Sequence, residues 1–136
     1  MSKFLNDLCL RDLTDSKWAL TCDLQYQSDL LKCVVTIPSG FITDLASVPR
    51  VPILFPLWGD RAHYESVVHD YLYCVDSIPT VSESDANSVF LEAMEVRGKS
   101  WGIRYPMYWG VCIGGFTRFH KKTADYYKPL TQGEVK

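Results

Sequence analysis

The stretch RAHYESVVHDYLYCVDSIPTVSESDANSVFLEAMEVRG, residues 61–98, decides the fold because it holds two helical patterns with a short break at 74–81. The first pattern repeats apolar residues at the spacing of one helix face: Tyr64, Val67, Val68, Tyr71 and Leu72. The second begins at Ser82, where Ser82-Glu83-Ser84-Asp85 resembles a capping box, and ends at Gly98. Its apolar stripe is Ala86, Val89, Phe90, Ala93 and Met94. Because the break is short, we expect the two helices to pack as an antiparallel hairpin.

Alternating apolar and polar residues precede the hairpin and indicate β-strands. The alternation runs through WALTCDLQY at 18–26 and LKCVVTI at 31–37, with a loop at 27–29. A third helix follows the hairpin, with Pro106 expected in its first turn. The apolar stripe expected for this helix is Tyr105, Tyr108, Trp109, Cys112, Ile113 and Phe116. Strands followed by helices are typical of the α+β class. We therefore predict a small N-terminal antiparallel β-sheet, then the helical hairpin and a third helix.

Length and charge limit the domain organisation and the class of partner. The chain has 136 residues, with 14 Lys and Arg against 16 Asp and Glu, a net charge of −2. That length suits one domain, which we expect to span residues 1–125, followed by a polar C-terminal tail at 126–136. A nucleic-acid partner is not expected, because such proteins usually carry a strongly basic face.

Cysteine usage and the apolar segments bear on the compartment. Five cysteines stand at wide spacings without a C-x-x-C pair, which favours reduced thiols in a cytosolic compartment. Cys22 and Cys33 lie on adjacent predicted strands, so their thiols could approach each other. The N-terminus has no signal-peptide pattern, and segment 101–116 is shorter than the roughly 20 residues that span a bilayer. We expect no secretion by a signal peptide, while contact of 101–116 with a membrane surface stays open.

The candidate chemistry lies in the helical hairpin. His69 and Tyr73 share a helix face, and antiparallel packing places Asp85 of the second helix opposite them. We expect His69 to hydrogen bond Asp85, because a carboxylate fixes the tautomer of an imidazole and stabilises its charged form. Asp70 points about 100° away from His69 and could hold a cation. Three interpretations stay open: a catalytic pair, a polar clamp in the core, and a metal site drawn from His63, His69, Asp70 and Asp44.

A proline-rich connection at 41–60 holds two candidate binding residues. We expect Asp44 and Arg50 to be ordered by contacts near His69, because prolines lower the entropy of fixing such a segment. The alternative is that Asp44 caps a turn through Ser47.

An aromatic cluster occupies the expected third helix. Aromatic residues in a helix more often belong to the core than to a binding platform, because each can bury a large apolar area. If the hairpin is only a clamp, this cluster becomes the expected partner-binding surface, since aromatic residues concentrate binding energy at interfaces. Its members are Trp101, Tyr105 and Trp109.

Two stretches together resemble a known family: TDLASVPR at 43–50, and VVHDYLY at 67–73 followed by SDANSVFLEAM at 84–94. They are similar to a family of small, mostly bacteriophage and prophage proteins, the domain of unknown function 1353. Its pattern is Thr-Asp-x-Ala-Ser-x-Pro-Arg, then His-Asp-x-Leu-Tyr, then a helix resembling Ala-Asp-x-x-Phe. Here a serine at 84 replaces the alanine. The resemblance implies a phage protein of the host cytoplasm or the virion, with no assigned activity.

A more distant resemblance concerns calcium-dependent phospholipases of the A-two class, in which a His-Asp-x-x-Tyr helix faces an Asp on an antiparallel helix. It implies that His69 activates water and that Asp85 orients His69. It also implies that Tyr73 hydrogen bonds the Asp85 carboxylate and that Asp70 binds calcium. This chain has no glycine-rich calcium loop, the part that completes the coordination in those enzymes.

Two classes of function follow. The first is a phage accessory protein in which the His69–Asp85 pair and Tyr73 hydrolyse an ester or lipid. Asp44 and Arg50 would bind the substrate, and calcium or another divalent metal would assist. The second is a non-enzymatic phage protein without a cofactor. It would be either a virion or tail component or an inhibitor of a host defence system, with a phage virion or host protein as partner.

Overall fold

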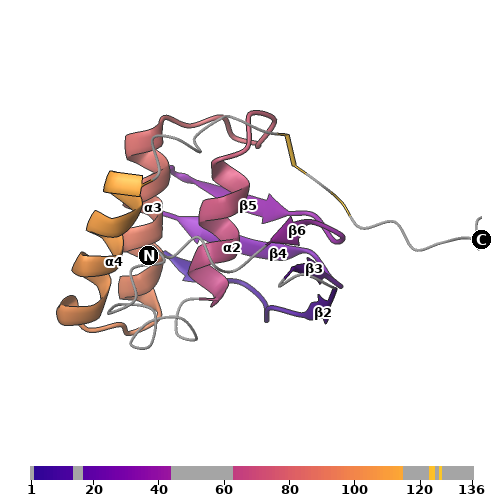
Figure 1. The fold of residues 1–136 in the computed structure, drawn as a ribbon, viewed down its shortest axis with the longest axis horizontal. Coiled ribbons are helices and arrows are strands. Elements are labelled where there is room, and N and C mark those ends of the chain that lie inside the picture. Colours follow the sequence, from indigo (N-terminus) through magenta and orange to yellow (C-terminus); the bar gives the residue numbers. More distant parts are fainter. Residues whose placement is uncertain (1, 14–16, 44–62, 115–122, 125, 127–136) are drawn as a thin grey trace, which may run out of the picture.

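The computed structural model describes residues 2–13, 17–43, 63–114, 123–124 and 126. Within this part of the chain, short strands precede helices, which confirms the α+β class (Figure 1). The strands are β1 (Lys3–Phe4), β2 (Leu10–Asp12), β3 (Trp18–Leu20), β4 (Leu24–Ser28), β5 (Cys33–Ile37) and β6 (Ile42–Thr43). The helices are α2 (His63–Leu72), α3 (Glu83–Val96) and α4 (Trp101–Gly114). The strands form two antiparallel sheets, ordered β1-β4-β5 and β2-β3-β6.

The single strand predicted over 18–26 is wrong, because β3 and β4 are separate strands in different sheets. Polar groups hold the bend between them. Asp23 Oδ1 accepts a hydrogen bond from the backbone N–H of Ser39 at 2.7 Å, and the Asp23 carbonyl accepts one from Asn6 Nδ2 at 2.6 Å. These hydrogen bonds join Asp23 to segments distant in sequence and hold the chain in the bend. β5 pairs with β4 and confirms a strand within 31–37, although it begins at Cys33. The loop predicted at 27–29 is misplaced, because β4 runs to Ser28 and the turn spans 29–32.

The helices stack outward from the β1-β4-β5 sheet (Figure 1). α2 contacts β5, α3 packs on α2, and α4 packs on α3, which therefore lies between the other two helices. One apolar cluster joins the strands to α2 and α3, and a smaller one joins α3 to α4. The helical hairpin is confirmed, because its predicted stripes are buried in these clusters: Val67, Val68, Tyr71, Leu72, Ala86, Val89, Phe90, Ala93 and Met94.

Glu92 of α3 fastens this helix to the β4–β5 hairpin. Its Oε1 accepts hydrogen bonds from the Tyr26 hydroxyl and the Ser28 hydroxyl, each at 2.7 Å. Its Oε2 accepts one from the backbone N–H of Leu30 at 3.0 Å. Hydrogen bonds to an ionised carboxylate are about twice as strong as neutral ones. They set the position of α3 against the sheet, and with it the position of every α3 side chain that faces α2.

The ends of α3 follow the sequence signals. Ser82 is the N-cap, and its hydroxyl accepts a hydrogen bond from the backbone N–H of Asp85 at 3.1 Å. Gly98 has a positive φ of 79°, and the next residue, Lys99, donates its backbone N–H to the carbonyl of Met94 at 2.9 Å. This is the left-handed turn that ends many helices, and glycine adopts it without the steric cost of a side chain.

The third helix differs from its prediction in where it begins. α4 starts at Trp101, and the backbone N–H groups of Ile103 and Arg104 donate to the carbonyl of Ser100, which closes the first turn. Pro106 lies inside the helix rather than in its first turn. Its nitrogen cannot donate to the carbonyl of Gly102, so the helix tolerates one missing backbone hydrogen bond there.

The face that α4 buries also differs from the predicted stripe. Met107 and Val111 face α3, where they pack with Phe90 and Met94, whereas Tyr105 and Trp109 of the predicted stripe are exposed. Tyr108 and Cys112 are only half-buried, and the side chains of 113 and 116 lie outside the described residues. Large apolar side chains occur on every side of this helix, so periodicity alone did not select the buried face.

Candidate functional site

Three buried polar side chains stand one turn apart, two on α2 and the third at Tyr73, the residue after its end. Glu65, His69 and Tyr73 are 0%, 3% and 7% exposed, and their spacing of four residues aligns them on one helix face. That face looks toward α3, because each of the three side chains has a hydrogen-bond partner on α3 or on the residue that ends it. The contact between the two helices is therefore polar along this edge.

Asn87 joins His69 to Tyr73. Its Oδ1 lies 2.9 Å from His69 Nε2 and accepts a hydrogen bond from the Tyr73 hydroxyl at 2.6 Å. Its Nδ2 donates to the thiol sulfur of Cys112 on α4 at 3.6 Å. Asn87 is itself 3% exposed. One amide thus links α2, α3 and α4 inside the molecule.

The orientation of the Asn87 amide indicates which nitrogen of His69 faces it as a donor. Because its amide nitrogen donates to Cys112, the carbonyl oxygen faces His69 and can only accept. With the amide in this orientation, Nε2 is the nitrogen of His69 that donates to Asn87 Oδ1. The ring is held on two further sides, since its centroid lies 4.1 Å from that of Tyr73 and 5.0 Å from that of Phe90.

The expected hydrogen bond between His69 and Asp85 is wrong, because Asn87 stands where the carboxylate was predicted. Asp85 is exposed in the first turn of α3, and its backbone N–H bonds to the N-cap Ser82. The two positions point about 200° apart around a helix. Since Ala86 and Phe90 face the core, Asn87 lies at the buried edge of the stripe and Asp85 at its solvent side.

The tyrosine was expected to bond the Asp85 carboxylate and bonds the Asn87 carbonyl instead. Burial raises the pKa of Tyr73 above its ordinary value, and the nearby negative charge of Glu83 raises it further. The phenol therefore stays protonated at neutral pH and acts as a hydrogen-bond donor. It donates to the Asn87 carbonyl, which is the contact that joins Tyr73 to α3.

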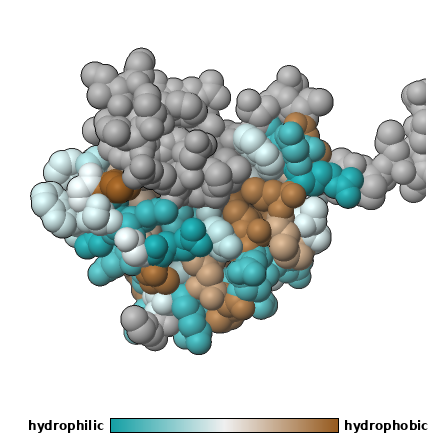
Figure 2. Space-filling model, turned by 90° about the horizontal axis from the view of Figure 1, so that it is seen from below, coloured by the Kyte–Doolittle hydropathy of each residue, from teal (hydrophilic) through white to brown (hydrophobic). Residues whose placement is uncertain are grey.

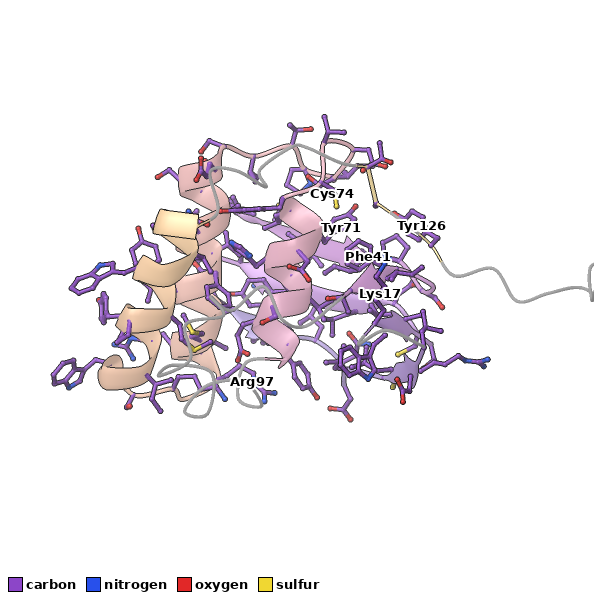
Figure 3. All side chains as sticks on the ribbon, viewed as in Figure 1. Lys17, Phe41, Tyr71, Cys74, Arg97 and Tyr126 are labelled. Atoms are coloured by element: carbon purple, nitrogen blue, oxygen red, sulfur yellow. The ribbon has the colours of Figure 1, made fainter. Side chains whose placement is uncertain are left out.

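Glu65 is a buried carboxylate with one defined partner. Its Oε1 accepts a hydrogen bond from Arg97 Nε at 3.1 Å, and the guanidinium of Arg97 also lies 3.8 Å from the ring centroid of Tyr64. Figure 3 shows Arg97 beside one end of α2. Glu65 Oε2 is buried and has no hydrogen-bond partner within the described part of the chain. Burial raises the pKa of Glu65, while Lys99 and Arg97 oppose that rise.

Asp70 points away from this cluster and toward the second sheet. Its Oδ2 accepts a hydrogen bond from the Thr43 hydroxyl at 2.7 Å, which ties the end of β6 to α2. The ring of Phe41 lies 5.6 Å from that of Tyr71 and 6.2 Å from that of Tyr126, and Figure 3 shows the three side by side near the end of α2. Asp70 is therefore held by the junction between the β2-β3-β6 sheet and the helices.

The described residues contain no group of three or more His, Cys, Asp or Glu side chains placed to hold a metal ion. Asp70 can contribute one carboxylate, but the predicted second metal ligand, Asp44, lies outside the described residues, as does Arg50. The backbone of His63 begins α2, and its side chain is not among those described. The predicted metal and substrate contacts therefore stay predictions.

Three aromatic residues of α4 are exposed. Trp101 is 74% exposed, Tyr105 40% and Trp109 61%, and the spacing of four residues places them along one outer face. We call these three residues the aromatic stripe. Figure 2 shows the molecule from below, where hydrophobic residues lie in patches between hydrophilic ones. Among the described residues, no helix is long and apolar enough to cross a membrane.

Sequence reasoning missed Asn87, Glu65 and Arg97. Asn87 carries a signal, because it lies between two residues of the predicted apolar stripe and one turn before Leu91. A polar residue on the edge of a buried stripe needs a partner across the interface. Arg97 carries none, since an arginine at the end of a helix is usually exposed.

The chain was compared with protein families, with curated proteins and with solved structures. A family model described as a protein of unknown function (DUF1353) matches residues 18–111, from β3 into α4. No curated protein and no solved structure matches. The matched region contains the buried cluster around His69 and the aromatic stripe.

Proposed function

The chain belongs to the DUF1353 family of proteins of unknown function, and we propose that it is a non-enzymatic phage protein that acts by binding another protein. The partner is a phage virion or tail protein, or a component of a host defence system that the protein inhibits. The observation that carries this proposal is the aromatic stripe: three large aromatic side chains exposed in line on one helix.

The composition of the stripe suits a binding surface. Trp, Tyr and Arg are the residues most enriched among those that dominate the energy of protein interfaces. Trp101, Tyr105 and Trp109 stand exposed on α4, and Arg104 lies beside them with its guanidinium 5.5 Å from the Tyr105 ring. Tryptophan and tyrosine contribute large contact area at low entropic cost, because each has few rotatable bonds.

Charge around the stripe indicates the chemistry of the partner. α4 contains no Asp or Glu, and its one charged residue is Arg104. Lys99 precedes the helix, and its carbonyl accepts a hydrogen bond from Arg104 at 3.0 Å. The chain as a whole is slightly acidic, so this end of α4 is locally basic. We expect an apolar groove with an acidic rim on the partner, into which the aromatic side chains insert as helix anchors.

The buried cluster around His69 supports the same proposal, because it is better suited to a structural role than to catalysis. His69 is 3% exposed, and its Nε2 faces the carbonyl oxygen of the Asn87 amide. The amide nitrogen of Asn87 donates a hydrogen bond to Cys112. A base that accepts a proton from substrate must come within hydrogen-bond reach of it. A ring packed between Tyr73 and Phe90 is better suited to hold helices together.

Affinity capture followed by reconstitution tests the proposal. The tagged full chain is used to capture partners from a bacterial lysate, and each captured protein is purified and its binding measured by calorimetry. We expect the double variant Trp101→Ala/Trp109→Ala to weaken binding by at least about 100-fold, since anchors of this kind each contribute about 2 kcal/mol or more. The control is Ile78→Ala, which removes an equally exposed apolar side chain, 77% exposed, far from α4 in sequence.

Two outcomes contradict the proposal. One is reconstituted binding that the double variant leaves unchanged. The other is a wild-type dimer in solution, seen by light scattering, that the double variant converts to a monomer, because the stripe would then serve contact between copies of this chain.

The second candidate function is metal-assisted hydrolysis of an ester or lipid. It is favoured by one observation, the 2.9 Å contact between His69 Nε2 and Asn87 Oδ1, because an orienting residue contacts a general base in this way. In this candidate Asn87 takes the orienting role expected of Asp85, and a neutral amide is known in that role in cysteine proteases. Asp70 would hold calcium or another divalent metal, and Asp44 and Arg50 would contact the substrate.

A substrate panel separates the two candidates. Ester and phospholipid substrates are assayed with calcium, with zinc and with a chelator, for the wild type and for His69→Ala and Asn87→Ala. Hydrolysis predicts metal-dependent activity that falls by orders of magnitude in both variants while thermal melts show that they remain folded. Absence of activity, together with lower melting temperatures in both variants, favours the clamp and the binding function.

A further inference from the structure

Two cysteines that are thirteen residues apart in the sequence lie at one end of the β2–β3 ladder. Cys9 comes directly before β2 and Cys22 follows β3, and the ladder pairs Leu10 with Leu20. One more backbone hydrogen bond, from the N–H of Thr21 to the carbonyl of Cys9 at 2.9 Å, places Cys9 opposite the residue before Cys22. The fold therefore fixes the backbones of both residues beside each other.

Their thiols converge on a single acceptor. The Sγ atoms of Cys9 and Cys22 lie 3.9 Å and 3.8 Å from the carbonyl oxygen of Asp7. The Cys9 thiol beside Cys22 raises the pKa of the Cys22 thiol above its ordinary value. Cys9 is exposed and Cys22 half-exposed, so small molecules in solution can reach them.

The other cysteines are placed differently. The Cys74 thiol is buried and donates to the carbonyl of Asp70 at 3.3 Å, and Cys112 accepts from Asn87 inside the helical cluster. Cys33 lies at the start of β5 in the other sheet. The sequence suggested that Cys22 could approach Cys33, and the structure instead brings Cys22 to Cys9.

We propose that Cys9 and Cys22 form a redox-sensitive pair that closes to a disulfide when it meets a disulfide oxidant such as glutathione disulfide. The Cys9 thiolate attacks the oxidant, which forms a mixed disulfide and releases one glutathione. The Cys22 thiolate then attacks the Cys9 sulfur, which forms the Cys9–Cys22 bond and releases the second glutathione. The pair loses two electrons and two protons, and one glutathione disulfide becomes two glutathione thiols.

The bond would lock the sheet that reaches the helices. A link from Cys9 to Cys22 closes a loop that contains β2 and β3. It would reduce the number of conformations open to the unfolded chain and so stabilise the folded state. β3 pairs with β6, and Thr43 at the end of β6 donates to Asp70 of α2. Oxidation would therefore stabilise the β2–β3 ladder that positions this junction. This inference does not depend on the binding function proposed for α4.

Mass spectrometry of the full chain tests the proposal. The reduced protein is incubated with mixtures of glutathione and its disulfide, the thiols are trapped by alkylation, and tryptic peptides are mapped. Arg11 and Lys17 lie between the two cysteines, so cleavage there leaves peptides that only a disulfide can join. We expect a linked Cys9–Cys22 pair, loss of two hydrogen atoms from the intact mass, and a rise in melting temperature of several degrees.

Matched variants make the outcome decisive. Cys22→Ser should stop at a glutathione adduct on Cys9, whereas Cys33→Ser should still form the link. The proposal is overturned if the trapped disulfide joins a different pair, or if the wild type gathers only glutathione adducts. It is equally overturned if the wild type stays fully reduced in excess glutathione disulfide.

Discussion

Replacing Asn87 by alanine is the sharpest perturbation of the buried cluster. Asn87 is 3% exposed, and its carbonyl oxygen faces both His69 Nε2 at 2.9 Å and the Tyr73 hydroxyl at 2.6 Å. Alanine removes this acceptor and leaves two donors in the interior. The helix backbone is undisturbed, because alanine is a better helix former than asparagine.

The size of the effect follows from those two donors. A buried polar group that loses its partner costs about 1–3 kcal/mol, so two donors cost about 2–6 kcal/mol. The higher helix propensity of alanine returns about 0.6 kcal/mol, and Tyr73, at 7% exposed, can recover part of its loss by turning toward water. We therefore expect Asn87→Ala to lower the free energy of unfolding by about 1–4 kcal/mol. Such a loss is measurable against a typical domain stability of about 5–15 kcal/mol.

Urea unfolding followed by circular dichroism measures this difference, with Asp85→Ala as the matched control. Asp85 lies two residues away on the same helix but is exposed, and its backbone N–H keeps its bond to Ser82 in the variant. We expect its change to stay below about 1 kcal/mol, the range of a charge near a helix N-terminus. Equal losses in the two variants, or a larger loss in Asp85→Ala, would refute the assignment of Asn87 as the partner of His69.

Three further outcomes are expected. Burial raises the pKa of Glu65 above its ordinary 4.5, so the folded state binds more protons than the unfolded state, and stability falls as pH rises above 4.5. Urea melts from pH 4.5 to 7 should then show Glu65→Gln gaining stability relative to wild type as pH rises, and parallel pH profiles would contradict this. Gly98→Ala should cost about 1 kcal/mol because its φ is 79°, whereas Gly102→Ala should gain about 0.5–1 kcal/mol, since a methyl group there meets open space within a helix; thermal melts that reverse this order would contradict both. Trp101→Ala and Trp109→Ala should each change stability by under about 0.5 kcal/mol in the same melts, and a large loss would show that the stripe supports the fold.

The helical hairpin could be predicted because several local signals agree. The apolar stripes, the N-cap at Ser82 and the glycine at 98 each depend on residues close in sequence, and all of them are found in the structure. Consistency of this kind between local preference and burial is what specifies an element.

The rest depended on contacts between distant segments. The strand over 18–26 is interrupted because Asp23 bonds to Ser39 and Asn6, and neither bond has a local signature. The face of α4 was misplaced because its aromatic residues look like core until α3 is known to cover Met107 instead. In both cases the sequence pattern fits more than one structure, and contacts between distant segments determine which one forms.

The partner of His69 was missed for a geometric reason. Antiparallel packing correctly brings the end of α2 to the start of α3, but a shift of two residues turns a side chain about 200° around a helix. Asp85 has the chemistry expected of an orienting residue, and Asn87 has the position. The charge of Asp85 favoured it in the prediction over Asn87, which is the residue that contacts His69.

The imidazole of His69 offers the most direct measurement of whether the hairpin is held by Asn87. Nitrogen NMR of the full chain at pH 7 distinguishes the two neutral tautomers, and the proton on Nε2 can be followed by its exchange with solvent. We predict a neutral ring with a proton on Nε2 that exchanges slowly with solvent. The slow exchange should be unchanged in Asp85→Ala and lost in Asn87→Ala. A proton on Nδ1, or a ring that responds to Asp85→Ala and not to Asn87→Ala, would contradict the clamp.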